Sequence, residues 1–264
     1  MRKNKVYEGI FIKILVIISF IGMIASNIMS SVLPLNNISM KELSDLYPNL
    51  FTPAPYTFGI WSIIYIALAG FAIYQVNPPQ GGTEGISPGD LLRIRVAFVF
   101  SCVINALWLV SWHYRYLELS VILMVLLLIT LIYINNITRR DRLSNKETLF
   151  VRAPFSLYFG WITVATIANI TIFFVGRQWD LLGISPVIWT ILVLIIGITI
   201  ASIVVIRNRD LVYPAAVLWG YGGILANHFS SNGFGGRYYS IMIVTVACMV
   251  VLLVVSVVRS LYRD

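Results

Sequence analysis

Charged residues are scarce in this chain: Asp, Glu, Lys and Arg make up 11% of its 264 residues, whereas a soluble domain carries roughly 25%. The acidic residues fall near the ends of long apolar runs or between them. No carboxylate therefore lies deep in an apolar run, where it would mark a proton relay or an ion site. Together with a hydrophobic content of 59%, this scarcity excludes a soluble domain and indicates an integral membrane protein.

Groups that catalyse reactions or bind metals are also few. The chain has two histidines, His113 and His228, and two cysteines, Cys102 and Cys248. Neither histidine has a cysteine or carboxylate at metal-ligand spacing, and the glycine-rich segments lack the lysine of a phosphate-binding loop. The net charge of +8 is spread over short segments, which argues against nucleic-acid binding. We expect no required cofactor and no nucleic-acid partner, and we favour a function other than catalysis.

Long apolar runs are abundant. About 20 apolar residues cross a bilayer as a helix, and these runs do not alternate as the strands of a membrane β-barrel do. The fold class predicted is an all-α integral membrane protein, a polytopic helical bundle of about eight transmembrane helices. The predicted spans are residues 9–31, 55–76, 93–113, 117–137, 150–174, 184–206, 211–227 and 238–260. The seventh is the weakest, because it is short and rich in glycine.

Basic residues predict the orientation of the spans, since cytoplasmic loops carry an excess of Lys and Arg. With the N-terminus inside, only Lys41, Arg115, Arg177 and Arg237 lie in outer segments, and the other basic residues, apart from Lys13 within the first span, lie inside. We expect a multi-pass protein of a bacterial cell membrane with both termini in the cytoplasm. The first run exceeds a signal-peptide core and lacks a cleavage pattern, so we interpret it as a retained helix.

Three predicted helices carry aromatic and polar residues on one face. In helix 150–174, at about 100° per residue, Tyr158, Ala165 and Asn169 lie nearly in line with Trp161 beside them. The other two faces consist of Phe58, Trp61 and Tyr65 in helix 55–76 and of Ser101, Asn105, Trp108 and Trp112 in helix 93–113. Such faces pack on neighbouring helices or line an apolar pocket for a flat ligand.

In these segments the chain resembles the TspO/MBR family of tryptophan-rich sensory proteins, which includes the mitochondrial translocator protein. Residues 53–65 are similar to the family segment that enters its second helix, with prolines followed by spaced aromatics. Asn105 to Trp108 resembles its Asn-x-Leu-Trp, and Tyr158 to Asn169 resembles its Tyr-x-x-Trp-x-x-x-Ala-Thr-x-x-Asn. The motifs follow the family's order over residues 9–175.

The resemblance implies a TspO-like five-helix bundle in residues 1–175, with a ligand cavity under the loop that joins helices one and two. Family members bind porphyrins and other flat hydrophobic molecules and are often dimeric. We therefore expect a binding protein, sensor or carrier for a hydrophobic small molecule, with a tetrapyrrole as a candidate ligand and a homodimer as a candidate assembly. The implied ligand-binding residues are Tyr56, Trp61, Asn105, Trp108, Tyr158, Trp161, Ala165 and Asn169.

Two other functions stay open. The first is a transporter of small hydrophobic molecules, for which the number of spans suffices. Transporters often contain internal repeats, and the separation of Trp219 and Asn227 repeats that of Trp161 and Asn169. This repeat is either a partial internal duplication or a coincidence. An enzyme that degrades a bound pigment ranks last, because the sequence offers no general base or metal site.

The chain departs from the family in several places. Phe51 and Tyr56 stand where tryptophans are usual in the family. The sterol-associated pattern of some members is absent, because the stretch from Asn169 to Arg177 contains no tyrosine. Residues 176–264 form a C-terminal extension of about three transmembrane helices. The long connection 32–54, with a short helix predicted at residues 40–46, is interpreted either as a lid or as a tether.

Overall fold

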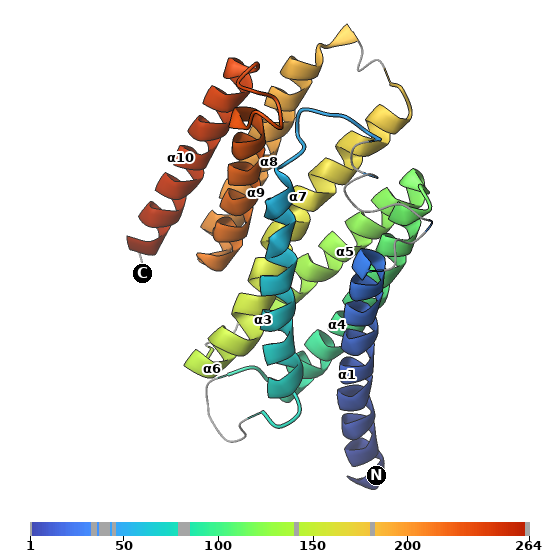
Figure 1. The fold of residues 1–264 in the computed structure, drawn as a ribbon. Helices are drawn as coiled ribbons and strands as arrows, with labels where there is room; N and C mark the ends of the chain where they lie inside the picture. Colours follow the sequence, from blue (N-terminus) through green and yellow to red (C-terminus); the bar gives the residue numbers. More distant parts are fainter. Residues whose placement is uncertain are drawn as a thin grey trace. The chain divides into compact units, whose positions relative to one another are not determined.

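The structure is a computed structural model that describes residues 2–32, 36, 43, 46–78, 85–139, 143–179 and 183–261. Within these residues there is no β-strand, and eight long helices follow one another along the chain (Figure 1). They are α1 (Arg2–Val32), α3 (Ile60–Tyr74), α4 (Pro88–His113), α5 (Leu117–Thr138), α7 (Ala153–Gly176), α8 (Pro186–Asn208), α9 (Val212–Phe229) and α10 (Tyr239–Leu261). The short elements are the 3₁₀-helix η2 (Pro55–Gly59), helix α6 (Asn145–Glu147) and the π-helical turn η3 (Thr148–Arg152).

Seven helical segments of the described chain are long and apolar enough to cross a membrane. They are Gly9–Ser30, Pro55–Tyr74, Pro88–His113, Leu117–Thr138, Asn145–Gly176, Pro186–Asn208 and Tyr239–Leu261. The predicted all-α, multi-pass membrane protein is therefore confirmed. The span predicted at 211–227 is present as helix α9 but is not among the seven, since its 18 residues include several glycines and polar side chains.

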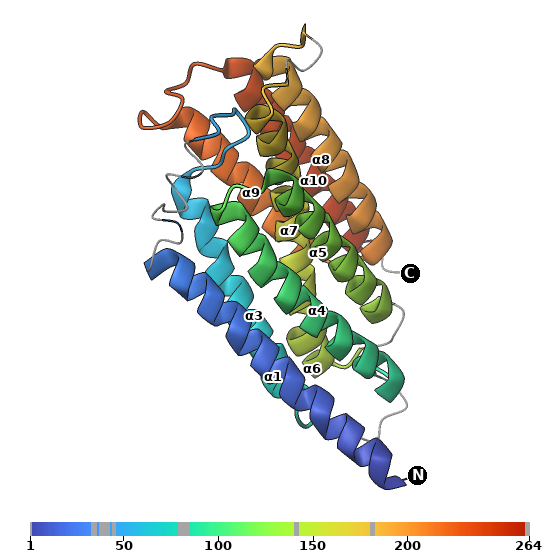
Figure 2. The same ribbon diagram turned by 90° about the vertical axis from the view of Figure 1, so that its right-hand side faces the viewer.

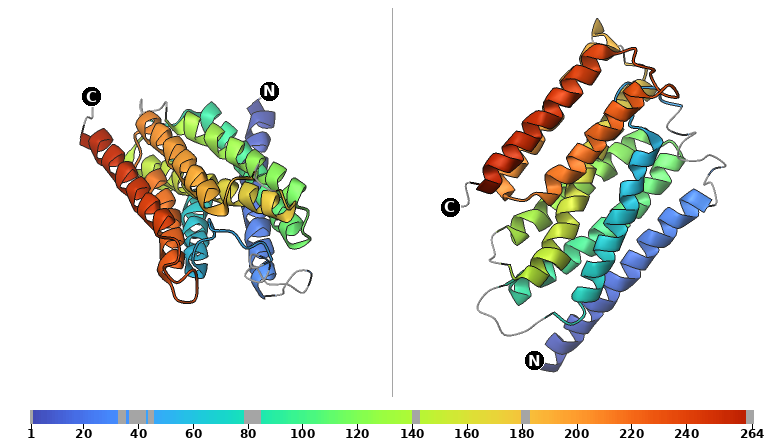
Figure 3. Two further views of the ribbon diagram at one scale, coloured as in Figure 1. Left: turned by 90° about the horizontal axis from the view of Figure 1, so that it is seen from above. Right: turned by 60° about the vertical axis from the view of Figure 1, so that its left-hand side comes forward.

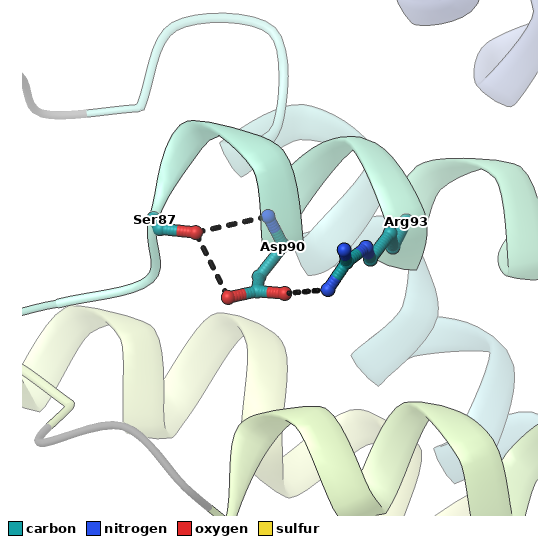
Figure 4. Close-up of polar contacts among 3 residues, drawn as sticks. All are labelled: Ser87, Asp90 and Arg93. Atoms are coloured by element: carbon teal, nitrogen blue, oxygen red, sulfur yellow. Dashed lines mark hydrogen bonds and ion pairs between the residues drawn. The ribbon is translucent and has the colours of Figure 1, made fainter.

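Helix α4 begins at Pro88, earlier than the predicted residue 93, because Ser87 caps its first turn (Figure 4). The Ser87 hydroxyl accepts a hydrogen bond from the Asp90 amide at 3.0 Å and donates one to the Asp90 carboxylate at 2.8 Å. That carboxylate pairs with Arg93 at 2.9 Å. A serine cap, a proline at the first position and an acidic first turn all favour a helix start. The polar turn lies outside the apolar run, so hydropathy alone sets the start too late.

Of the connection 32–54, interpreted as a lid or a tether, residues 33–35, 37–42, 44 and 45 lie outside the described residues. The short helix predicted at residues 40–46 falls largely outside the described residues, since only 43 and 46 of these are described. Residues 46–54 are described, and they bear directly on the candidate site.

The chain forms two compact units, one of Met1–Met40 and Ser62–Ser156 and the other of Lys41–Trp61 and Leu157–Asp264. In the first unit, α4 packs against α1 and α5, as Figure 2 shows. The rings of Phe71, Phe98 and Phe155 meet at its core, with centroids 4.8–5.6 Å apart. The division predicted at residue 175 rests on family resemblance rather than on compactness, and it stays a prediction.

Two buried polar contacts join helices of the first unit. The Asn27 side chain of α1 donates to the Asn105 carbonyl oxygen of α4 at 3.0 Å. Arg95, only 7% exposed, donates to the side-chain oxygen of Gln75 at 2.9 Å and to the Gln75 backbone carbonyl beyond the end of α3. A cation near a helix C-terminus is favoured by the helix dipole.

In the second unit, α10 packs against α8 and α9 (Figure 3). Close approach between helices depends on glycine at two positions. A methyl group on Gly160 of α7 would overlap the Tyr213 backbone carbonyl of α9, and one on Gly197 of α8 would press on the Tyr221 hydroxyl. The Tyr213 hydroxyl donates to the Thr163 hydroxyl at 3.2 Å, and that of Tyr221 donates to the Leu194 carbonyl at 2.7 Å. Small residues with buried hydrogen bonds are how membrane helices associate.

Candidate ligand-binding site

Four aromatic side chains of the second unit form a cluster, called the aromatic cluster below: Phe58, Trp61, Tyr158 and Trp161. The Trp61 ring centroid lies 5.9 Å from that of Tyr158 and 6.2 Å from that of Trp161. Phe58 lies 6.2 Å from Trp161, and the ring planes in all three pairs are steeply inclined, at 67–89°. Edge-to-face pairs of this kind are favourable. The faces predicted on helices 55–76 and 150–174 therefore meet at these residues.

Trp161 carries the distinctive polar atom of the aromatic cluster. Its side chain is 3% exposed, and its Nε1 has no hydrogen-bond partner among the residues that the structure describes. Burial of a polar group without a partner costs about 1–3 kcal/mol, and such groups in native proteins call for an explanation such as an absent water or ligand. An acceptor atom placed against this N–H would remove the cost.

The other predicted residues of the second unit lie at varying distances along the chain from this cluster. Ala165, half-buried, and Asn169, 5% exposed, lie about two and three turns beyond Tyr158 on α7. Tyr56 is 59% exposed, and its ring packs edge-on against Trp219 of α9 at 5.9 Å. Tyr56 thus lies beside α9 rather than among the rings of the aromatic cluster.

Asn105 and Trp108 belong to the first unit. Both are buried in α4, and Asn105 accepts the hydrogen bond from Asn27 described above. Their part in ligand binding stays a prediction.

Residues 50–59 lead into α3, and hydrogen bonds to four residues of α9 hold them against that helix. We call them the approach segment. Trp219 Nε1 donates to the Thr57 carbonyl at 2.7 Å, and the Asn227 side chain donates to the Thr52 carbonyl at 2.9 Å. The Gly223 carbonyl accepts from the Ala54 amide at 2.9 Å. His228 Nε2 lies 2.9 Å from the Leu50 carbonyl, which only accepts, so this nitrogen carries the proton.

Glycine at position 223 is required by this contact. A methyl group there would overlap the side chain of Thr57, which is fully buried. Gly222, next to it, has open space except for the end of the Met249 side chain at 3.9 Å. The approach segment can therefore lie directly on the α9 backbone, which fixes the start of the helix that carries Trp61.

One ring nitrogen of each histidine bonds to a backbone carbonyl. His113 Nδ1 lies 2.9 Å from the Leu109 carbonyl, and His228 is bonded to Leu50. Within the described part of the chain, no group of three or more His, Cys, Asp or Glu side chains could hold a metal ion.

Sequence reasoning missed the residues of α9 that hold the approach segment. The one available signal was the spacing of Trp219 and Asn227, which was interpreted as a duplication or a coincidence. In the structure these two side chains lie about 12 Å apart along the helix, at 1.5 Å per residue, and both donate to backbone carbonyls of the approach segment. A backbone carbonyl has no sequence signature, so the pairing was not predictable.

The comparisons with known proteins give one match. The model of the TSPO-like protein family matches residues 13–258, which covers nearly the whole chain, the last three helices included. No curated protein and no solved structure matches the chain.

Proposed function

Because the chain belongs to the TSPO-like protein family, we propose that it is a membrane-embedded binding protein, acting as a sensor or carrier for a flat hydrophobic ligand such as a tetrapyrrole. The observation that carries the proposal is the convergence of Trp61, Tyr158 and Trp161 with an unpartnered indole N–H in their midst. Aromatic rings offer broad contact to a flat molecule, and one polar group orients it.

The mechanism of binding follows from the chemistry of these side chains. The ligand stacks on the rings of Trp61 and Trp161, and Tyr158 closes the site from α7. The Trp161 N–H donates to an acceptor on the ligand, such as a carbonyl, ring nitrogen or carboxylate oxygen. Of the remaining predicted residues, Ala165 and Asn169 on α7 extend the site within the second unit.

The test is a titration of the purified protein in detergent with protoporphyrin IX, followed by the shift of the porphyrin absorption band and by quenching of tryptophan fluorescence. The Trp161→Ala variant is expected to bind at least ~1 kcal/mol more weakly, about fivefold, because an aromatic contact and a donor are both removed. Tyr239→Ala is the control, since Tyr239 lies outside the aromatic cluster and is 72% exposed.

An unchanged affinity in Trp161→Ala, with saturable binding in the wild type, would place the porphyrin elsewhere on the protein. Absence of saturable binding in the wild type would mean that the ligand is not a tetrapyrrole.

Transport is the second candidate function. The chain is divided into two compact units, and the backbone passes between them at residues 40–41, 61–62 and 156–157. Transporters commonly move one bundle against another around a site near the middle of the membrane. Uptake of protoporphyrin IX into proteoliposomes against protein-free vesicles would distinguish transport from binding alone.

We further propose that the protein lies in a bacterial cell membrane with both termini in the cytoplasm, on the strength of the basic residues in the segments assigned to the inside. Labelling of single cysteines introduced at Arg115 and Arg207 with a membrane-impermeant reagent in intact cells would test this: modification only at residue 115 is expected. The family resemblance also implies a homodimer, which cross-linking in membranes would detect.

A further inference from the structure

A pocket of about 330 Å³ lies in the second unit, apart from the aromatic cluster. Its wall is formed by the end of α7, the start of α8, residues 48–50 and the chain just before α10. We call it the rim pocket. Because it gathers helix ends, it lies toward one end of the unit, which the proposed orientation makes the outer face of the membrane. Nothing in the proposed function makes use of it.

Aromatic rings dominate the lining of the rim pocket. Phe174, Trp179 and Trp189 lie on one side, with centroids 4.4–6.3 Å apart and ring planes inclined at 48–85°. Phe234 and Tyr238 contribute a second pair at 5.7 Å and 78°. Rings set at steep angles present both faces and edges, which suits a ring-bearing ligand.

Besides the indole N–H groups of Trp179 and Trp189, which are donors, the lining has two threonine hydroxyls that are placed to accept hydrogen bonds. Thr171 and Thr190 are 3% and 2% exposed. Their hydroxyls donate to the Ile167 and Pro186 carbonyls at 3.0 and 2.8 Å. A hydroxyl has one proton and two acceptor sites, so each oxygen is left as an acceptor. None of the described residues that line the pocket is charged. A neutral ligand suits this uncharged lining, and a donor on it can reach the threonine oxygens.

The volume limits the size of that ligand. Small-molecule sites span roughly 300–1,000 Å³, so the rim pocket is at the small end. At the ~30 Å³ that a water molecule occupies in the liquid, it has room for roughly eleven water-sized groups. A molecule with two fused rings fits this space.

From these features we propose that the rim pocket is a second binding site, for a small neutral hydrophobic molecule with one or two rings and one hydrogen-bond donor, such as a phenol or an indole. This ligand differs in size and polarity from the one proposed for the aromatic cluster, so we expect each site to bind its own ligand.

The experiment uses the full-length protein in detergent, labelled with 5-fluorotryptophan, and 2-naphthol as the probe. Fluorine resonances of Trp179 and Trp189 are assigned with Trp179→Phe and Trp189→Phe. We expect saturable shifts of these two resonances, with those of Trp61 and Trp161 unmoved. Shifts of all tryptophan resonances that do not saturate would mean partition into detergent only, and shifts confined to Trp61 and Trp161 would place the probe in the aromatic cluster; either result overturns the proposal.

The hydrogen-bond donor is tested on both partners. The affinity for 2-naphthol, measured by calorimetry, is expected to fall about three- to tenfold in Thr190→Val, because one hydrogen bond is lost. The wild type should bind 2-methoxynaphthalene, which has no donor, more weakly than 2-naphthol by a similar factor. Thr199→Val is the matched control, because Thr199 also donates to a carbonyl one turn back on α8 but does not line the pocket. Equal affinities in Thr190→Val and Thr199→Val, with equal binding of both probes, would contradict the assigned chemistry.

Discussion

Helices α4 and α7 carry similar patterns of aromatic and polar residues, but the structure uses their polar atoms differently. On α4, the Asn105 side chain is engaged by Asn27 of α1, so the polar atom joins two helices. On α7, the Trp161 N–H is buried among other rings without a partner in the described chain. The Asn105 side chain thus has a partner on another helix of its unit, whereas no described residue accepts from the Trp161 N–H.

This difference shows how a packing contact and a binding site can share a sequence pattern. Both faces combine tryptophan with a polar residue at helical spacing, and neither spacing nor hydropathy separates them. The distinguishing property is whether a protein group satisfies the buried polar atom, because a satisfied atom has little to offer a ligand and an unsatisfied one costs stability until a ligand binds.

The largest effect is expected from Gly223→Ala, which tests whether α9 holds the approach segment that leads to the aromatic cluster. The added methyl group would overlap the Thr57 side chain, and overpacking of this kind typically costs about 1–3 kcal/mol. The melting temperature in detergent should fall. Gly222→Ala is the control and should have no such effect, since its methyl group meets open space. Equal melting temperatures for the two variants would mean that this contact does not constrain the segment.

A smaller effect is expected from Asn105→Ala, which removes the contact between α1 and α4. Loss of the hydrogen bond to Asn27 should cost about 0.6 kcal/mol of stability, the average for polar contacts between membrane helices, and at most about 1.7 kcal/mol. Affinity for protoporphyrin IX should stay unchanged if the role of Asn105 is to join α1 and α4. A fall in affinity at constant stability would instead place Asn105 in the ligand site.

A local effect is expected from Asn227→Ala, which removes one of the hydrogen bonds between α9 and the approach segment. Hydrogen exchange at the Ala54 amide should accelerate about three- to tenfold, since a hydrogen bond contributes roughly 0.5–1.5 kcal/mol and this region opens locally. Asn232→Ala is a suitable control, because residue 232 is exposed in the loop after α9. Unchanged exchange in Asn227→Ala would show that the remaining contacts hold the segment alone.

Much of the fold was predictable from the sequence, because an apolar run long enough to cross a membrane has one stable backbone conformation, the helix. The seven apolar spans and the meeting of Trp61 with Tyr158 and Trp161 follow from such runs and from helical spacing. The start of α4 at Pro88 was missed because a cap is a matter of hydrogen bonding at Ser87 rather than of hydropathy. The role of Trp219 and Asn227 was missed because their acceptors are backbone carbonyls, and the rim pocket was missed because it is assembled from segments far apart in the chain.

The measurement that tests the central claim most directly is the affinity of Trp161→Phe for protoporphyrin IX, taken together with its melting temperature. This substitution keeps a ring and removes the buried N–H. The account predicts an affinity about three- to tenfold lower at an unchanged or slightly raised melting temperature, because the free protein loses an unsatisfied donor. An unchanged affinity, or a loss of affinity that only accompanies a loss of stability, would contradict the claim that Trp161 binds the ligand.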